Sequence, residues 1–209
     1  MKKLLVEGGD EKRVLPYLLE DLGIPWPEDA RPADIEHHNG VEELLSPGVI
    51  DAYLKESELN AIGFVFDADT APQDRWRSLR EKFEPYVTEF PHRAPNGGVL
   101  LQATPGCKLG IWMMPDNFSA GMLEDFLATL VPRKAEALWK HAEASVEEAK
   151  VLGAPYRNSH LIKAKLHTWL AWQDPPGQQL HSAIMQNKLR SGGDLAKSFR
   201  DWFIALFGL

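Results

Sequence analysis

Short apolar runs alternate with segments of helical periodicity over the first 130 residues, and this alternation constrains the fold more than any other feature. The clearest run is residues 61–66, Ala-Ile-Gly-Phe-Val-Phe, which is apolar on both faces, as in a strand covered by helices on each side. Strand–helix–strand units of this kind join parallel strands by right-handed crossovers. We therefore expect an α/β fold with a mainly parallel sheet flanked by helices.

The expected elements follow from where apolar residues repeat and where Gly and Pro interrupt them. Strands are expected at residues 3–6, 33–38, 61–66, 99–102 and 109–114, the last two adjacent and joined through 104–106. Helices are expected before Gly23, over 41–57 with a break near 46–48, and over 72–85 and 120–131. Residues 1–131 are therefore interpreted as one α/β domain.

Beyond Pro132 only helical patterns remain, at residues 133–151, 158–172, 178–190 and 195–207. Residues 132–209 are interpreted as a helical C-terminal extension packed on the α/β domain. The last helix carries an apolar stripe made of Phe199, Trp202, Phe203, Leu206 and Phe207. Core packing is the favoured interpretation of this stripe, and the alternative is a partner surface, such as the face of a homodimer formed through the C-terminal helices.

The charge is distributed unevenly along the chain. The net charge of −7 argues against a nucleic-acid binder that works by bulk attraction. Residues 1–130 carry 12 Lys and Arg against 23 Asp and Glu, whereas residues 131–209 carry 11 against 7. Such a distribution suits a cation site that faces a phosphate-binding surface, although ordinary variation in composition could also produce it.

The chain has one cysteine, Cys107, so it has no internal disulfide framework, which fits a reducing cytoplasm. The N-terminal apolar run stops at Glu7 and is too short for an export signal. No segment is apolar for long enough to cross a bilayer. We expect a cytoplasmic protein with no membrane partner.

Acidic residues follow three of the apolar runs, at Glu7, at the pair Asp67 and Asp69, and at Asp116. In an open α/β sheet, ligands bind beyond the carboxyl ends of the strands, which is where these acids are expected. Clustered carboxylates repel one another and have raised pKa values unless a cation neutralises them. Hard oxygen ligands of this kind select Mg²⁺, Mn²⁺ or Ca²⁺ over zinc.

Each acid also has a purely structural interpretation. Asp10 could be the N-cap of the first helix, a contribution of about 1 kcal/mol. Glu124 and Asp125 fall in the first turn of a helix, where the helix dipole favours acids. The tripeptide at 67–69 is a common turn composition. The coincidence of three acidic strand ends nevertheless favours a metal site.

Two of these motifs together resemble a known pattern. Residues 4–10, Leu-Leu-Val-Glu-Gly-Gly-Asp, followed by residues 65–69, Val-Phe-Asp-Ala-Asp, resemble the two signature motifs of the toprim superfamily. Residues 110–127, 165–172 and 199–207 look like a stand-alone toprim-like family of unassigned function, close to the OLD (overcoming lysogenization defect) nuclease branch. The resemblance covers nearly the whole chain and implies a toprim, Rossmann-like sheet.

The resemblance implies roles for individual residues. Glu7 matches the toprim glutamate, a metal ligand or general acid/base, and Asp67 and Asp69 match the metal-binding pair. In OLD-type nucleases further acids extend the site to two ions, here expected to be Mg²⁺ or Mn²⁺. Asp10 and two later acids occupy those places in this sequence, namely Asp116 and Glu124.

Those enzymes also place a lysine near the scissile phosphate. Lys165 is the candidate in this chain, so Glu7 and Lys165 form the expected catalytic pair. Lys165 flanks an apolar helical stripe, however, and a lysine in such a position often only extends its ammonium group to water.

Metal-dependent cleavage of phosphodiester bonds in DNA or RNA is the first functional hypothesis. The second is a regulatory module of the same fold that binds nucleic acid or a nucleotide without cutting it, an option that the low overall basicity favours. A phosphotransferase or phosphatase built on the same acids is the third. Each of the three hypotheses is compatible with a separate partner protein.

Overall fold

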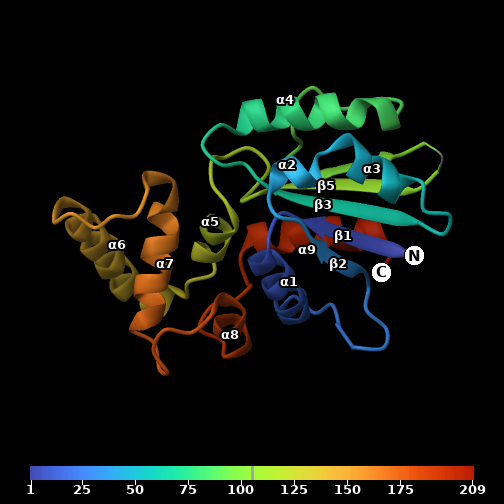
Figure 1. Cartoon of the computed structure of the whole chain (residues 1–209). Coiled ribbons are helices and arrows are strands. Elements are labelled where there is room, and N and C mark those ends of the chain that lie inside the picture. The colour runs from blue at the N-terminus through green and yellow to red at the C-terminus, as the bar shows by residue number, and fades with distance from the viewer. Residues whose placement is uncertain (105) are drawn as a thin grey trace.

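A computed structural model describes residues 1–104 and 106–209 of the chain. Its centre is a five-stranded sheet (Figure 1). The strands are β1 (Lys2–Val6), β2 (Asp34–His37), β3 (Ala61–Asp67), β4 (Val99–Gln102) and β5 (Lys108–Met114). Their spatial order is β2-β1-β3-β5-β4, with all neighbours parallel except β4, which is antiparallel to β5. The predicted α/β fold with a mainly parallel sheet is confirmed.

The expected strands are all present, and β4 and β5 are adjacent, as predicted. Of the expected connection 104–106, Pro105 lies outside the described residues. The strand order reverses direction at β1, because the chain leaves β1 toward β2 and returns beside it as β3. A reversal of this kind opens a crevice at the carboxyl edge of the sheet, between β1 and β3.

Helices cover both faces of the sheet and extend beyond one of its edges. They are α1 (Gly9–Asp21), α2 (Val41–Leu44), α3 (Pro47–Leu54), α4 (Pro72–Phe83), α5 (Leu123–Ala128), α6 (Glu136–Val151), α7 (Leu161–Ala171), α8 (Leu180–Met185) and α9 (Asp194–Phe207). The helices α2, α3 and α4 lie on one face of the sheet and α1 and α9 on the other (Figure 1).

The helix expected at 120–131 is shorter in the structure. It begins only at Leu123, because Met122 has an extended backbone and Gly121 has φ = +142°. A side chain at residue 121 would also meet the carboxylate of Asp125, since its Cβ would lie 2.7 Å from Asp125 Oδ2. Asp125 uses that oxygen to accept a hydrogen bond from the Met122 amide, 2.8 Å away, and so caps the shortened helix.

The final helix α9 packs directly on the sheet. Its aromatic stripe is buried inside the chain, with Phe199, Phe203 and Leu206 fully covered. Core packing of this stripe is therefore confirmed, and the stripe is not available as a dimer face; a homodimer through other surfaces of the C-terminal helices stays a prediction. The close approach depends on glycine, because a Cβ at Gly63 or Gly110 would lie 2.8 or 2.6 Å from Leu206 Cδ2.

Gly110→Ala is expected to destabilise the protein by about 1–3 kcal/mol, because the added methyl group pushes Leu206 and the helix that carries it away from the sheet. Gly48→Ala in α3 is the matched control, since a Cβ there meets nothing within 4 Å. The free energy of unfolding, measured in urea, should fall for the first variant only. Equal values for both would contradict this description of the α9 contact.

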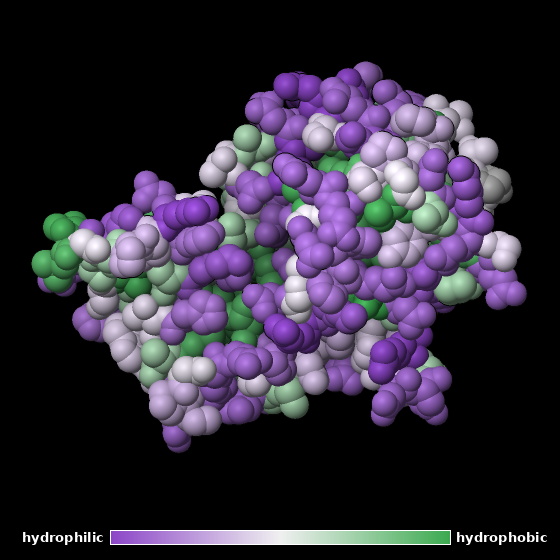
Figure 2. All heavy atoms as spheres, viewed as in Figure 1, coloured by the Kyte–Doolittle hydropathy of each residue, from purple (hydrophilic) through white to green (hydrophobic). Residues whose placement is uncertain are grey.

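The helices α6 and α7 form a lobe that projects beyond the carboxyl edge of the sheet (Figure 1). They pack on each other through Trp139 and Trp169, whose ring centroids are 6.4 Å apart. Figure 2 shows a hollow between this lobe and the main body, with hydrophobic residues in its depth and hydrophilic residues along its sides. No helix among the described residues has the length and apolar character needed to pass through a membrane.

Candidate functional site

The two acidic motifs meet at the carboxyl edge of the sheet. Glu7 follows β1 directly, and Asp67 is the last residue of the neighbouring strand β3. The parallel register, which pairs Val6 with Val65, brings the two positions side by side. The Asp67 amide donates a hydrogen bond to Glu7 Oε1 over 2.9 Å. The adjacency expected from the sequence is therefore present in the structure.

Glu124 reaches the same place from α5. Its side chain is only 2% exposed, although it carries a carboxylate. The loop before α5 is tied to the end of β3 by backbone hydrogen bonds between Asp69 and Gly121, at 2.9 and 2.7 Å. The next contact is 3.0 Å long and runs from the Leu123 amide to Asp67 Oδ1. These bonds place the first turn of α5 against Asp67.

A fourth acid, Glu11, is one that the sequence analysis did not single out. It lies four residues after Glu7, in the first turn of α1, and is buried, with 8% of its surface exposed. Its carboxylate approaches the loop so closely that a Cβ at Gly8 would lie 3.0 Å from Glu11 Oε2. The only signal in the sequence was a second acid beside Asp10 in Glu-Gly-Gly-Asp-Glu. We refer to Glu7, Glu11, Asp67 and Glu124 as the acid cluster.

One lysine faces the acid cluster, and it comes from the projecting lobe. Lys163 in α7 lies 3.2 Å from Glu124 Oε1, measured from Nζ. It lines a cleft of about 510 Å³ together with three members of the cluster, Glu7, Glu11 and Asp67. Burial lowers the pKa of Lys163, but the charge and the hydrogen bond of Glu124, together with the charges of Asp67 and Asp10, outweigh this effect and hold the pKa above its ordinary value. Lys163 is therefore an internal counter-ion.

Lys165, the lysine expected near the phosphate, lies elsewhere. Its Nζ is 2.8 Å from Glu147 and 3.6 Å from Glu143, both in α6. It lines the groove between α7 and the main body, which also includes Asp69. Residues two apart on a helix point to different sides, so Lys163 and Lys165 cannot both face the acid cluster.

Three of the expected metal ligands lie outside the acid cluster. Asp10 is exposed at the rim of the cleft, 3.4 Å from Arg13. Asp69 has φ = +53° and is paired with Arg75 of α4. Asp116 folds back on its own loop, where Oδ1 accepts hydrogen bonds from the amides of the next residues, at 3.1 Å from Phe118 and 2.7 Å from Ser119.

The burial of several carboxylates in one place raises their pKa values. For Asp67 the pKa rises to about 9, first because burial removes water and then because Glu11, Glu7 and Glu124 repel its charge. Burial is also the main cause that raises the pKa of Glu7 to about 7, against the opposing effect of the Asp67 amide. The pKa of Glu11 is raised for the same reason. The acid cluster therefore retains protons, because its full ionisation would create more negative charge than its surroundings balance.

The carboxylates do not converge on one point as they stand. Across residues 1–104 and 106–209, no three His, Cys, Asp or Glu side chains are arranged as a formed metal site. The hydrogen bonds explain this arrangement, because Glu7 is turned to the Asp67 amide, Asp67 to the Leu123 amide and Glu124 to Lys163. Side-chain rotations would be needed for these oxygens to share an ion.

The raised pKa values predict an unusual pH dependence of stability. A carboxyl group whose pKa is higher in the folded state makes the folded protein bind more protons than the unfolded chain. Stability is therefore highest below the unfolded pKa, roughly pH 4, and falls as the pH rises through the folded values of about 7 for Glu7 and about 9 for Asp67.

Urea unfolding of the protein in EDTA at pH 6 and pH 8.5 should show this loss, and saturating Mn²⁺ should reduce it. A urea midpoint of unfolding that stays constant or rises between the two pH values would show that ionisation of the acid cluster does not destabilise the folded protein.

Comparison with known proteins gives one result. A family described as "Protein of unknown function (DUF3226)" matches residues 1–208. No curated protein and no solved structure matches the chain at a significant level.

Proposed function

The chain belongs to the DUF3226 family of proteins of unknown function, and from its acid cluster we propose that it is a Mg²⁺- or Mn²⁺-dependent enzyme that cleaves phosphodiester bonds in DNA or RNA. The observation that carries the proposal is the meeting of Glu7, Glu11, Asp67 and Glu124 where the strand order reverses. Ligands of open α/β sheets bind at such a place.

The donor atoms of the acid cluster fit a hard divalent cation. All are carboxylate oxygens, which Mg²⁺ and Mn²⁺ prefer over nitrogen or sulfur. Glu7, Asp67 and Glu124 would hold the first ion, with Glu11 close enough to join them. Asp10 lies at the rim of the cleft and would be a ligand of a second ion, whereas Asp69 is paired with Arg75 and lines the neighbouring groove. A bound ion supplies positive charge that activates water and stabilises the leaving oxygen.

The protein's own residues would orient the substrate and move protons. Lys163 is placed to contact the phosphate, because it is the lysine that lines the same cleft as Glu7 and Asp67. Glu7 would either hold the ion or accept a proton from the attacking water, the two roles of the toprim glutamate that it matches. The assignment of Lys163 replaces that of Lys165, which is engaged with α6.

The resemblance to the toprim superfamily supports the proposal from a second direction. Its two signature motifs are represented here by Glu7 and by the Asp67–Asp69 pair, and two of these three acids are hydrogen-bonded neighbours. The basic C-terminal segment supplies Lys163 from across the cleft. Both observations are expected of a nuclease that holds a phosphate between metal and lysine.

A cleavage assay tests the proposal directly. Supercoiled DNA, linear duplex DNA, single-stranded DNA and RNA are each incubated with the protein in Mn²⁺, in Mg²⁺ or in EDTA. We expect at least one substrate to be cut with metal and none in EDTA. Asp29→Asn, a change in an exposed turn, serves as the control for charge. If no substrate is cut and Mn²⁺ leaves the melting temperature unchanged, the proposal is wrong.

A further inference from the structure

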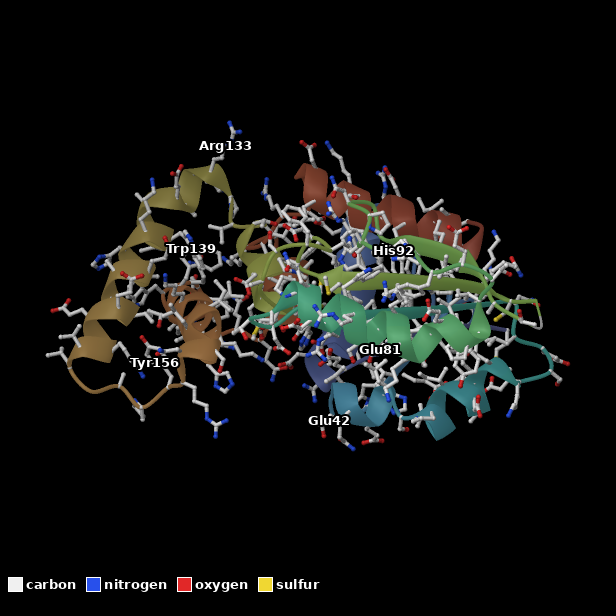
Figure 3. All side chains as sticks on the ribbon, turned by 90° about the horizontal axis from the view of Figure 1, so that it is seen from above. Glu42, Glu81, His92, Arg133, Trp139 and Tyr156 are labelled. Carbon is white, nitrogen blue, oxygen red and sulfur yellow. The ribbon has the colours of Figure 1, made fainter. Side chains whose placement is uncertain are left out.

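A second concave site lies against α4, away from the acid cluster. It has a volume of about 590 Å³ and is formed by α4, by the loop at residues 91–94 and by the loop that follows β5. None of its lining residues lines the acid cleft. Figure 3 shows His92, one of these residues, beside α4 in the main body, whereas Arg133 and Tyr156 mark the projecting lobe.

The site is strongly basic in a protein that is acidic overall. Arg77, Arg80 and Arg93 line it together with His92, and no lining residue in the described part of the chain is acidic. Among the residues that the structure describes, only Arg77 of these arginines has an acidic partner within ion-pair distance, with 3.0 Å between its Nη1 and Asp74 Oδ1. In a chain of net charge −7 this local excess of arginine indicates an anionic ligand.

Arg80 has hydrogen-bonding capacity that the described residues leave unused. Its Nη1 lies 3.0 Å from His92 Nδ1, while its Nε is buried without a partner among residues 1–104 and 106–209. A buried guanidinium N–H without an acceptor costs free energy, so such groups normally have a partner. A turn of the Arg80 side chain toward the site would present its planar group to the oxygens of a phosphate, whose geometry it matches.

An aromatic ring stands at the edge of the same site. Phe118 is 61% exposed, an unusual state for a large apolar side chain. Its backbone is held in place by Asp116, which accepts a hydrogen bond from the Phe118 amide at 3.1 Å. The loop at 91–94 is anchored in turn by Trp76, whose indole N–H donates to the Pro91 carbonyl at 3.1 Å. Exposed rings of this kind stack on nucleic-acid bases.

We propose that the α4 site binds a nucleotide unit, with the phosphate on the arginines and the base on Phe118. The unit could be a free nucleotide or part of a single strand, because both present the same phosphate and ring. The site opens at the carboxyl edge of the sheet, where α4 follows β3 and Phe118 follows β5. Binding there needs no metal and does not depend on cleavage at the acid cluster.

Binding is measured in EDTA, so that neither metal nor cleavage contributes. Isothermal calorimetry with AMP and fluorescence anisotropy with a labelled six-residue oligo(dA) test the two sources of the ligand. Arg77→Ala/Arg93→Ala removes two exposed cations from the site and should raise the dissociation constant about tenfold or more. Arg133→Ala/Lys134→Ala removes two exposed cations from the projecting lobe and should change it less than about twofold.

Two further measurements separate specific binding from general attraction. Phe118→Ala should weaken AMP or oligo(dA) about fivefold or more, whereas Phe118→Tyr should bind as the parent does, because it keeps the ring. Ribose 5-phosphate, which has no base, should be insensitive to Phe118→Ala. Circular dichroism confirms that each variant is folded.

The outcomes divide clearly. Binding of AMP that the arginine and Phe118 variants weaken supports the proposal with a free nucleotide as the ligand. Binding of the oligonucleotide alone, weakened by the same variants, supports it with a strand as the ligand. No binding of either probe, or binding that the control pair weakens as much as Arg77→Ala/Arg93→Ala, overturns it. These binding results can be interpreted even if the nuclease assay shows no cleavage, because binding is measured in EDTA.

Discussion

Asp67→Asn is expected to abolish metal-dependent cleavage and, in the same protein, to increase the stability of the metal-free state. The loss of activity should be about 10³-fold or more, because the variant removes the carboxylate that we propose as the central metal ligand. The gain in stability follows from the position of Asp67, which is surrounded by Glu7, Glu11 and Glu124. A neutral amide of the same shape still accepts the hydrogen bond from the Leu123 amide.

The gain should be about 1–3 kcal/mol at pH 8 in EDTA. It should shrink as the pH is lowered and vanish below about pH 4, where Asp67 of the parent protein is protonated in the folded and the unfolded state alike. Urea unfolding at both pH values checks the stability, and the cleavage assay checks the activity. Asp29→Asn is the matched control. A variant that is less stable than the parent at pH 8 would mean that Asp67 is not repelled by its neighbours.

Lys163→Met is the second change with a large expected effect. It should lower the cleavage rate about 10²-fold, because a positive charge aimed at the phosphate is lost. It should also destabilise the metal-free protein by about 1–3 kcal/mol, because Glu124 is left buried without its cation. Saturating Mn²⁺ should restore the stability but not the rate, since the ion can replace the counter-charge of Glu124 but not the lysine's own contact with the phosphate.

Lys165→Met makes the test specific, because the same substitution two residues away removes a pair with the largely exposed Glu147. Such pairs contribute about 0–1 kcal/mol. Lys163→Arg keeps the charge and is the control that distinguishes loss of the charge from misfolding of the variant. If Lys165→Met lowers the rate more than Lys163→Met does, the lysine that serves the phosphate is the one expected from sequence, and the cleft assignment is wrong.

Most of the sheet and the centre of the site could be predicted from sequence. The strands that end at Val6 and Asp67 were recognisable as apolar runs, and the rule that parallel strands share a carboxyl edge brings Glu7 and Asp67 together. These features depend on local pattern and on one general rule of topology, so no knowledge of packing was required.

The remaining features depend on packing between distant segments. Whether Lys163 or Lys165 faces the acids is decided by the rotation of α7 about its axis, which follows from its contacts with α5 and α6. The burial of Glu11 likewise depends on how α1 leaves the loop at Gly8. The sequence analysis did not single out the arginines of α4, because their pocket exists only once the loops carrying His92 and Phe118 are in place.

The close packing of α9 on Gly63 and Gly110 affects how the protein folds during its synthesis. The ribosome completes β5 some eighty residues before it reaches α9, so the part of the sheet that α9 covers, over β3, β4 and β5, stays exposed while the intervening segments are synthesised. A nascent chain stalled within that interval should need a chaperone to avoid aggregation. The hydrophobic surface of the sheet is covered only when α9 has left the ribosome and packs on it.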